Sequence, residues 1–198
     1  VKVAREISQA KPDFLEMNIS CPNTESELGR PFSVSPLDTY QVTKEVKKIT
    51  KIPLIVKLSP NVTDIREIAK VAQDAGADVI SAINTLSGMV IDIESGKPIL
   101  TNKVGGVSGP AIKPISLRCV YQITQAVKIP VIGMGGITTG EDAIEMMMAG
   151  ARAVGIGSAV YYREMNVFSK ISKEIEIFMI NHQYKSLKEF RGVAHEKG

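Results

Sequence analysis

Short apolar runs alternate with longer amphipathic segments along most of the chain. Five of these runs are almost continuously apolar, which is typical of parallel strands buried on both faces and not of strands with one solvated face. We therefore expect parallel strands at residues 14–18, 54–58, 79–83, 130–133 and 153–156.

The segments between the apolar runs have helical periodicity and recognisable ends. Ser35 followed by Pro36 predicts an N-cap and a first helical position, which opens a helix to about Ile49. Gly76 and Gly150 are typical breakers at the C-terminal ends of two later helices. The remaining predicted helices lie near residues 3–7, 65–75, 112–126, 140–149 and 168–178, followed by a short last helix in which Ser186 and Glu189 have the spacing of a capping box.

This repetition of strand and helix predicts an α/β fold, either a barrel or an open doubly wound sheet. Residues 89–93 and 98–102 predict a β-hairpin inserted after the third strand. We expect a single domain over residues 1–198, as an incomplete TIM (β/α)8 barrel with five of the eight strands and helices at its end. Because a complete barrel needs about 250 residues, about three βα units are expected to precede residue 1.

Composition and charge argue against nucleic acid and membrane as partners. The formal net charge is only +3 and the basic residues are spread along the chain, so a nucleic-acid surface is not expected. No stretch of 18 apolar residues predicts a membrane span. The two cysteines, Cys21 and Cys119, do not form a disulfide framework, which favours the reducing cytoplasm.

Polar side chains follow the first three predicted strands. Ligands bind at the carboxyl ends of strands in α/β folds, so these side chains are candidates for binding one. Lys57 could be a surface lysine, but apolar residues precede it on a buried strand, where a lysine usually meets an anion or a polarised ring. The amides and the hydroxyl at the other two ends are Asn18, Asn84 and Thr85.

Glycines follow the last two strands, at residues 133–136 and 155–158. Such loops can hold a phosphate through backbone N–H groups, but a glycine after a strand can also serve only a tight turn. Two such loops at adjacent strand ends favour the phosphate site. A third backbone-exposing loop is expected at residues 105–109.

Cys21 follows the first strand, is fixed by Pro22, and begins a polar loop with the composition of a lid. The residues alone leave a reactive thiol and a structural cysteine equally open. Cys119 lies on an apolar helical stripe and is expected to be inert core. His182 and His195 lack the paired spacing of metal ligands, so no metal site is expected.

Six segments together resemble class 1 dihydroorotate dehydrogenases. The segment EMNISCPN at residues 16–23 resembles the active-site signature of that family. The resemblance continues in the family's order and spacing to about Tyr162. Between residues 83 and 114 the sequence most resembles the NAD-linked class 1B catalytic subunit. The other five segments are VKLSPN (56–61), INTLSGM (83–89), GGVSGPAIKP (105–114), GMGGI (133–137) and GIGS (155–158).

The resemblance implies a TIM barrel that binds FMN and oxidises dihydroorotate to orotate in pyrimidine biosynthesis. By that resemblance Cys21 is the base that removes the C5 proton, while hydride passes to the flavin. Substrate binding is implied for Asn18, Asn23, Asn84 and Thr85, the last of which stands where the family often has serine. Contacts to FMN are implied for Asn18, Lys57, Ile83, Gly109, Gly135, Gly136, Gly157 and Ser158.

The family also implies a homodimer and, for class 1B, a separate iron-sulfur flavoprotein subunit that passes electrons to NAD. No CxxC set or dinucleotide fingerprint in this chain would supply that function. Three alternatives stay open: a related flavin barrel acting on another pyrimidine, such as that of a dihydropyrimidine dehydrogenase; an inactive barrel fragment; and a flavin-free phosphate-binding barrel.

Overall fold

The computed structural model describes residues 1–20 and 31–195. All five predicted strands are present, with ends that differ from the prediction by one residue at most. They form one parallel sheet made of β1 (Leu15–Asn18), β2 (Leu54–Leu58), β3 (Val79–Ala82), β8 (Val131–Met134) and β9 (Ala153–Gly155).

The order of the strands decides between the two predicted architectures. The sheet runs β1-β2-β3-β8-β9, so each strand lies beside the next strand of the sheet along the chain. A doubly wound sheet reverses its order at a switch point, and this one does not. The fold is therefore the wall of a barrel, open within the described residues because β1 and β9 do not pair.

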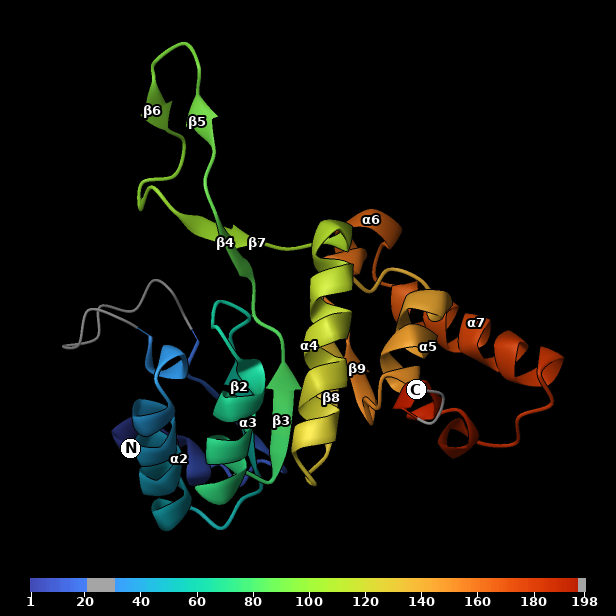
Figure 1. Cartoon of the computed structure of the whole chain (residues 1–198), viewed down its shortest axis with the longest axis horizontal. Helices are drawn as coiled ribbons and strands as arrows, with labels where there is room; N and C mark the ends of the chain where they lie inside the picture. Colours follow the sequence, from blue (N-terminus) through green and yellow to red (C-terminus); the bar gives the residue numbers. More distant parts are fainter. Residues whose placement is uncertain (21–30, 196–198) are drawn as a thin grey trace.

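Four helices connect the strands and pack in sequence against one another. They are α2 (Pro36–Ile49), α3 (Ile65–Asp74), α4 (Lys113–Ala126) and α5 (Gly140–Met148). Right-handed crossovers between consecutive parallel strands place all of them on one face of the sheet (Figure 1). At the two ends of this layer, α1 (Lys2–Ser8) packs against α2, and α7 (Val167–Asn181) packs against α5.

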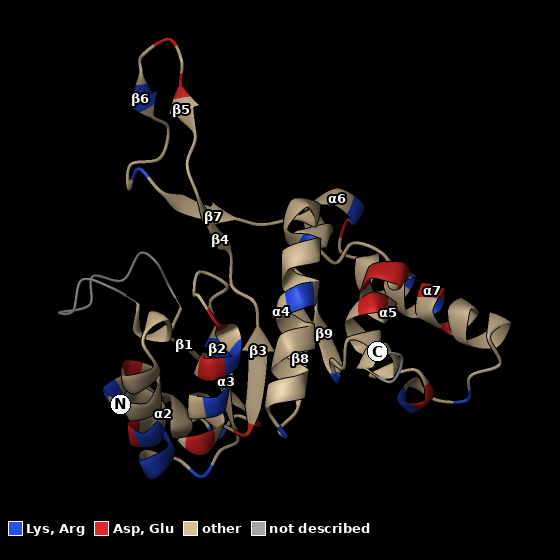
Figure 2. Cartoon of the chain, in the orientation of Figure 1, with Lys and Arg blue, Asp and Glu red and all other residues tan. Residues whose placement is uncertain are grey.

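The predicted N-cap of α2 forms. The Ser35 hydroxyl accepts a hydrogen bond from the backbone N–H of Asp38, which caps α2. At α5, Thr139 and Asp142 form a reciprocal capping box. Acidic and basic side chains alternate along α2 and α3 and do not gather into a surface of one sign in this view (Figure 2).

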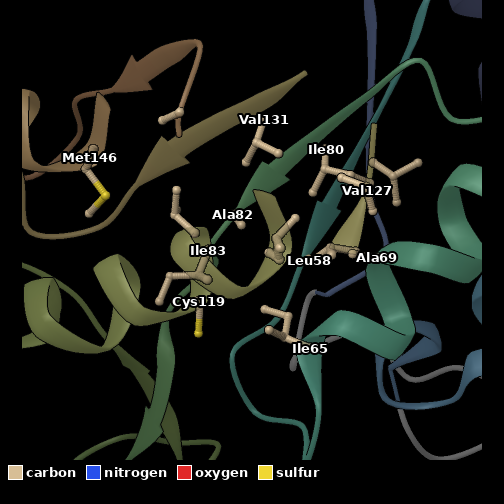
Figure 3. Packing of buried hydrophobic residues seen from close by; sticks show 14 of the residues in the cluster. Leu58, Ile65, Ala69, Ile80, Ala82, Ile83, Cys119, Val127, Val131 and Met146 are labelled. Carbon is tan, nitrogen blue, oxygen red and sulfur yellow. The ribbon is translucent and has the colours of Figure 1, made fainter. Parts of the chain in front are cut away.

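The hydrophobic core lies between the sheet and the helices. Leu54, Val56 and Leu58 alternate along β2 and are fully buried against that layer. Figure 3 shows Leu58 of β2 near Ile65 of α3, and Ile80 of β3 near Val127, which follows α4. Because successive strand residues point to opposite faces, the residues between them, such as Lys57, point to the other face, which forms the inside of the barrel.

The inserted hairpin is present but differs from its prediction. It projects away from the body of the molecule (Figure 1). Its tip pairs only β5 (Ile91–Asp92) with β6 (Lys97–Pro98), shorter than expected. Its base is a second pair, β4 (Leu86–Gly88) with β7 (Gly105–Val107). The prediction of a loop over 105–109 was therefore wrong for residues 105–107, because glycines there pair as a strand.

The C-terminal region holds one element that was not predicted and one whose capping was wrong. Helix α6 (Ala159–Arg163) follows the last glycine loop directly. The last helix is a 3-10 turn, η3 (Leu187–Glu189), and the Ser186 side chain does not cap it. Instead the Ser186 hydroxyl donates to the Glu189 carboxylate at 3.2 Å. The other 3-10 turns are η1 (Phe32–Val34), η2 (Pro110–Ile112) and η4 (Val193–His195).

Within the described ranges, no helix combines the length and the apolar character that crossing a membrane requires.

Candidate functional site

A cavity of about 330 Å³ opens at the carboxyl ends of the strands. That size is in the usual range for a small-molecule site. Lys57 is the one charged residue among its described lining residues. Nine of the predicted binding residues line it: Lys57, Ile83, Asn84, Thr85, Gly109, Gly135, Gly136, Gly157 and Ser158.

One half of the cavity is lined by side chains at the ends of β2 and β3, and residues at the end of β1 support them. The Asn84 amide donates to the Ser20 hydroxyl at 2.8 Å and to Asn18 Oδ1 at 3.3 Å, and its own oxygen accepts from the Thr85 N–H at 2.8 Å. Ser20 Oγ also donates to Asn18 Oδ1 at 2.9 Å. This network fixes the ends of β1 and β3 against each other.

Asn18 departs from its prediction in two respects. It lies beside Lys57 in the register of the sheet, yet it is not among the residues that line the cavity. Its side chain was expected to be buried, and it is exposed. The reason is that β1 is an edge of the sheet whose inner face is open within the described residues.

Thr85 is fixed by neighbours outside the cavity. The Asn61 amide donates to the Thr85 carbonyl at 3.1 Å and accepts from the Ser87 N–H at 3.0 Å. A side chain at Gly106 would collide with the Thr85 hydroxyl, so the base of the hairpin closes tightly over this strand end. The peptide bond between Ala82 and Ile83, which precedes this segment, is cis.

Lys57 stands at the centre of the side-chain half. Its ammonium lies 3.7 Å from the Glu16 carboxylate, with the lysine side chain 22% exposed and the glutamate side chain 37% exposed. The buried Ser81 hydroxyl donates to the other oxygen of the same carboxylate at 2.9 Å. A lysine so placed presents a fixed positive charge to whatever fills the cavity.

The other half of the cavity is built from backbone. Gly135 and Gly136 have φ values of +126° and +76°, in the region that L side chains rarely adopt. A Cβ at Gly136 would stand 2.8 Å from the Lys113 backbone nitrogen, so a side chain there would meet the start of α4. Gly109 likewise has a φ of +96°. These loops let a ligand approach the main chain closely.

A network of charged and polar groups supports the Gly135–Gly136 loop from behind. Asp142 accepts from the backbone N–H groups of Thr138 and Thr139 and from the Thr138 hydroxyl, at 2.8–2.9 Å. The Lys113 ammonium donates to its other oxygen at 2.7 Å. Burial alone would raise the pKa of the Asp142 carboxyl, but hydrogen bonds from Lys113 and Thr138 outweigh it and hold that pKa well below its usual range.

The family model described as dihydroorotate dehydrogenase matches residues 1–179. The chain belongs to the dihydroorotate dehydrogenase family.

Curated relatives of this family agree with that membership over almost the whole chain. The chain is 49% identical over 195 residues to the "dihydroorotate dehydrogenase B (NAD(+)), catalytic subunit" of Methanosarcina mazei, covering 98% of the chain and 62% of the relative. Against the protein of the same name from Alkaliphilus metalliredigens it is 52% identical over 191 residues, covering 96% of the chain and 63% of the relative. The chain thus spans less than two thirds of the length of these dihydroorotate dehydrogenases.

A solved structure shares the fold. The crystal structure of DHODH from Eimeria tenella in complex with ferulenol superposes with a TM-score of 0.79 at 24% identity. The match covers 96% of this chain and 57% of the other. The open five-stranded wall is thereby shown to be part of the TIM barrel of the dihydroorotate dehydrogenase family.

Two predicted site residues, Cys21 and Asn23, lie outside the described residues. The other cysteine, Cys119, is buried, as predicted, and burial raises the pKa of its thiol. Among residues 1–20 and 31–195 no three His, Cys, Asp or Glu side chains are placed to hold a metal ion. The His195 ring instead contacts the Thr124 hydroxyl and the Ala149 carbonyl, each at 3.0 Å.

The sequence reasoning missed three residues that support the site: Glu16, Ser20 and Asn61. All three stand inside the segments that resemble the family. Period-2 alternation along the first strand already placed Glu16 on the same face as Asn18. Nothing local marked Ser20 or Asn61, because their partners, Asn84 and Thr85, lie far away in sequence.

Proposed function

We propose that this chain forms the FMN-binding part of an enzyme that oxidises dihydroorotate to orotate in pyrimidine biosynthesis. The observation that carries the proposal is one cavity with two unlike halves, in a chain of the dihydroorotate dehydrogenase family. A lysine, one amide and the Thr85 hydroxyl line one half, and glycine loops line the other. FMN has the same two-part character, with a polar ring at one end and a phosphate at the other.

The residues present fit FMN. A side chain at Gly135 or Gly136 would collide with neighbouring residues, so only main chain lines the cavity there. A Cβ at Gly157 would meet only open space. Together with Gly109 and Ser158 these positions would hold the ribityl phosphate through main-chain N–H groups, which bind anions well. Lys57 would lie near N1 and O2 of the ring and stabilise negative charge there. Ile83 would contact the ring from the end of β3.

Each polar residue then has a defined task in the reaction. When bound, FMN supplies a hydride acceptor for C6 of dihydroorotate. Asn84 and Thr85 would orient the pyrimidine, with Asn18 and Asn23 completing its hydrogen bonds. Cys21 would take the proton from C5 as a general base. The chain reaches Ser20, which the Asn84 amide holds at 2.8 Å, immediately before that cysteine.

The partners of the reaction are proposed from the relatives. Proteins named catalytic subunits of an NAD(+) enzyme imply a second subunit, for which we propose an iron-sulfur flavoprotein that carries electrons to NAD. A homodimer of catalytic subunits would form its core. The catalytic subunit alone should then reduce an artificial dye with dihydroorotate but not NAD, and NAD reduction by the subunit alone would contradict the second subunit.

The decisive experiment is anaerobic mixing of the FMN-loaded protein with dihydroorotate while the visible flavin absorbance is followed. Bleaching by dihydroorotate but not by dihydrouracil supports the proposal. Bleaching by dihydrouracil alone would assign the chain to a dihydropyrimidine dehydrogenase-like enzyme, and a protein that stays colourless after reconstitution with FMN would refute any flavin function.

The role of Cys21 is tested by the same reaction. Cys21→Ser should slow flavin reduction roughly 100-fold, because serine is the poorer base near neutral pH. Cys119→Ala is the matched control, since that thiol is buried in the core, and its reduction rate should match the wild type. Unchanged kinetics in Cys21→Ser would remove the cysteine from the mechanism.

A further inference from the structure

Glu16 is a partly exposed carboxylate on the inner face of the sheet. Along β1, Leu15 is buried against the core, and Glu16 lies on the opposite face with Asn18. The neighbouring strand places Lys57 on this inner face, and Ser81 is paired with Lys57 in the register of the next strand. Three adjacent strands therefore each contribute one polar residue to a single cluster.

The contacts in this cluster are specific. Ser81 is fully buried, and its hydroxyl donates to Glu16 Oε2 at 2.9 Å. The other carboxylate oxygen, Oε1, lies 3.7 Å from the Lys57 ammonium. The glutamate thus crosses β2 to reach β3, and it is held at one oxygen while the other faces the lysine.

The position of Lys57 gives this pair its significance. Lys57 is the one charged residue among the described residues that line the cavity. Nearby, Lys113 has two carboxylates of its own, Asp142 and Glu145, each at 2.7 Å, and it does not line the cavity. A group bound in the cavity therefore experiences the positive charge of Lys57 after the nearby Glu16 carboxylate has partly offset it.

We propose that Glu16 is a positioning residue that holds the Lys57 ammonium and offsets part of its charge, and so lowers the tendency of the bound flavin to be reduced. This rests on the proposed function only in taking FMN as the ligand. At the separations of this cluster, opposite charges interact appreciably even when partly solvated. Removing the carboxylate charge should leave the lysine more strongly positive towards the ring.

Glu16→Gln tests the offset because glutamine keeps the length of the side chain and can still accept from Ser81. The equilibrium constant for two-electron reduction of bound FMN should rise about tenfold, which is about 30 mV for a two-electron couple. The measurement is a reductive titration with dithionite against a reference dye. An unchanged or lower potential would overturn the proposal. Glu45→Gln, which removes a carboxylate paired with Lys48 on the exposed face of α2, is the matched control and should leave the potential unchanged.

The holding of Lys57 is tested without flavin. In FMN-free protein the unfolding constants of Glu16→Gln, Lys57→Met and the double variant should be non-additive, by roughly two- to fivefold, as expected for a partly exposed ion pair. Additive effects would overturn the proposal. Neither titration uses dihydroorotate, so failure of the flavin to bleach with that substrate would count against the proposed function and leave this result standing.

Discussion

The two halves of the cavity are built from different materials. At the ends of β2 and β3 the cavity is lined by side chains, and a ligand would meet the Asn84 amide and the Lys57 ammonium. Around β8 and β9, function lies in the main chain, and Gly135 and Gly136 matter for the side chains they lack. The side-chain half should therefore tolerate substitution structurally and lose chemistry, whereas the backbone half should lose its shape.

Substitution at Gly136 should give the largest effect. Gly136→Ala forces a side chain onto a φ of +76° and against the Lys113 backbone at 2.8 Å. We expect a loss of about 3 kcal/mol in the free energy of unfolding, together with weaker FMN binding. Gly157→Ala is the matched control, because its Cβ would meet nothing within 4 Å, and it should stay within about 0.5 kcal/mol of the wild type. Equal losses of unfolding free energy in the two variants, measured by urea unfolding, would contradict the claim that only Gly136 lacks room for a side chain.

Loss of the Asp142 carboxylate should have the next largest effect. In Asp142→Asn an NH2 group faces either Lys113 or the Thr138 and Thr139 donors, so at least one hydrogen bond is replaced by repulsion. We expect the free energy of unfolding to fall by about 2 kcal/mol at neutral pH. A melting temperature equal to that of the wild type would show that the network does not support the loop.

The same network predicts a pH dependence. The folded pKa of Asp142 is depressed below the unfolded value, which is about 3.9. Its contribution to stability is therefore fully present above pH about 4 and is lost as the pH falls through the lower folded pKa. Wild type and Asp142→Asn should converge in stability during acid unfolding, and a constant difference down to the lowest pH would contradict this assignment.

Asn84→Ala should have the smallest effect on stability of these substitutions, and it should also weaken substrate binding. It removes hydrogen bonds to Ser20 and to the Thr85 N–H, so about 1 kcal/mol of stability should be lost. If Asn84 orients the pyrimidine, KM for dihydroorotate should rise about tenfold while FMN binding changes little, since one neutral hydrogen bond is worth about 1.4 kcal/mol at most. A rise in the dissociation constant of FMN with KM unchanged would place Asn84 at the flavin instead.

The sequence predicted the wall of the barrel and much of the cavity. Buried parallel strands have continuous apolar runs, so all five were found, and the ends of those strands pointed to seven of the residues that line one cavity. The resemblance to the family added Ile83 and Gly109. Ser35 and Pro36 marked the start of their helix because capping is local chemistry.

The features that could not be predicted depend on contacts between residues far apart in the sequence. Residues 105–107 read as a glycine loop because their strand pairing is with β4, formed by residues 86–88. Asn18 was expected to be buried, but its exposure depends on what covers the edge of the sheet. The link from Glu16 to Ser81 spans 65 positions, and no local pattern reveals it.

The preference of the protein for FMN over riboflavin tests most directly whether the two halves bind the two ends of one flavin. Riboflavin lacks the phosphate, so the wild type should bind FMN roughly 100-fold more tightly, as expected for two hydrogen bonds to a charged group. Lys57→Met should weaken both ligands and keep that ratio, whereas Gly136→Ala should abolish it. A ratio near one in the wild type, or a ratio lost in Lys57→Met and kept in Gly136→Ala, would contradict the account.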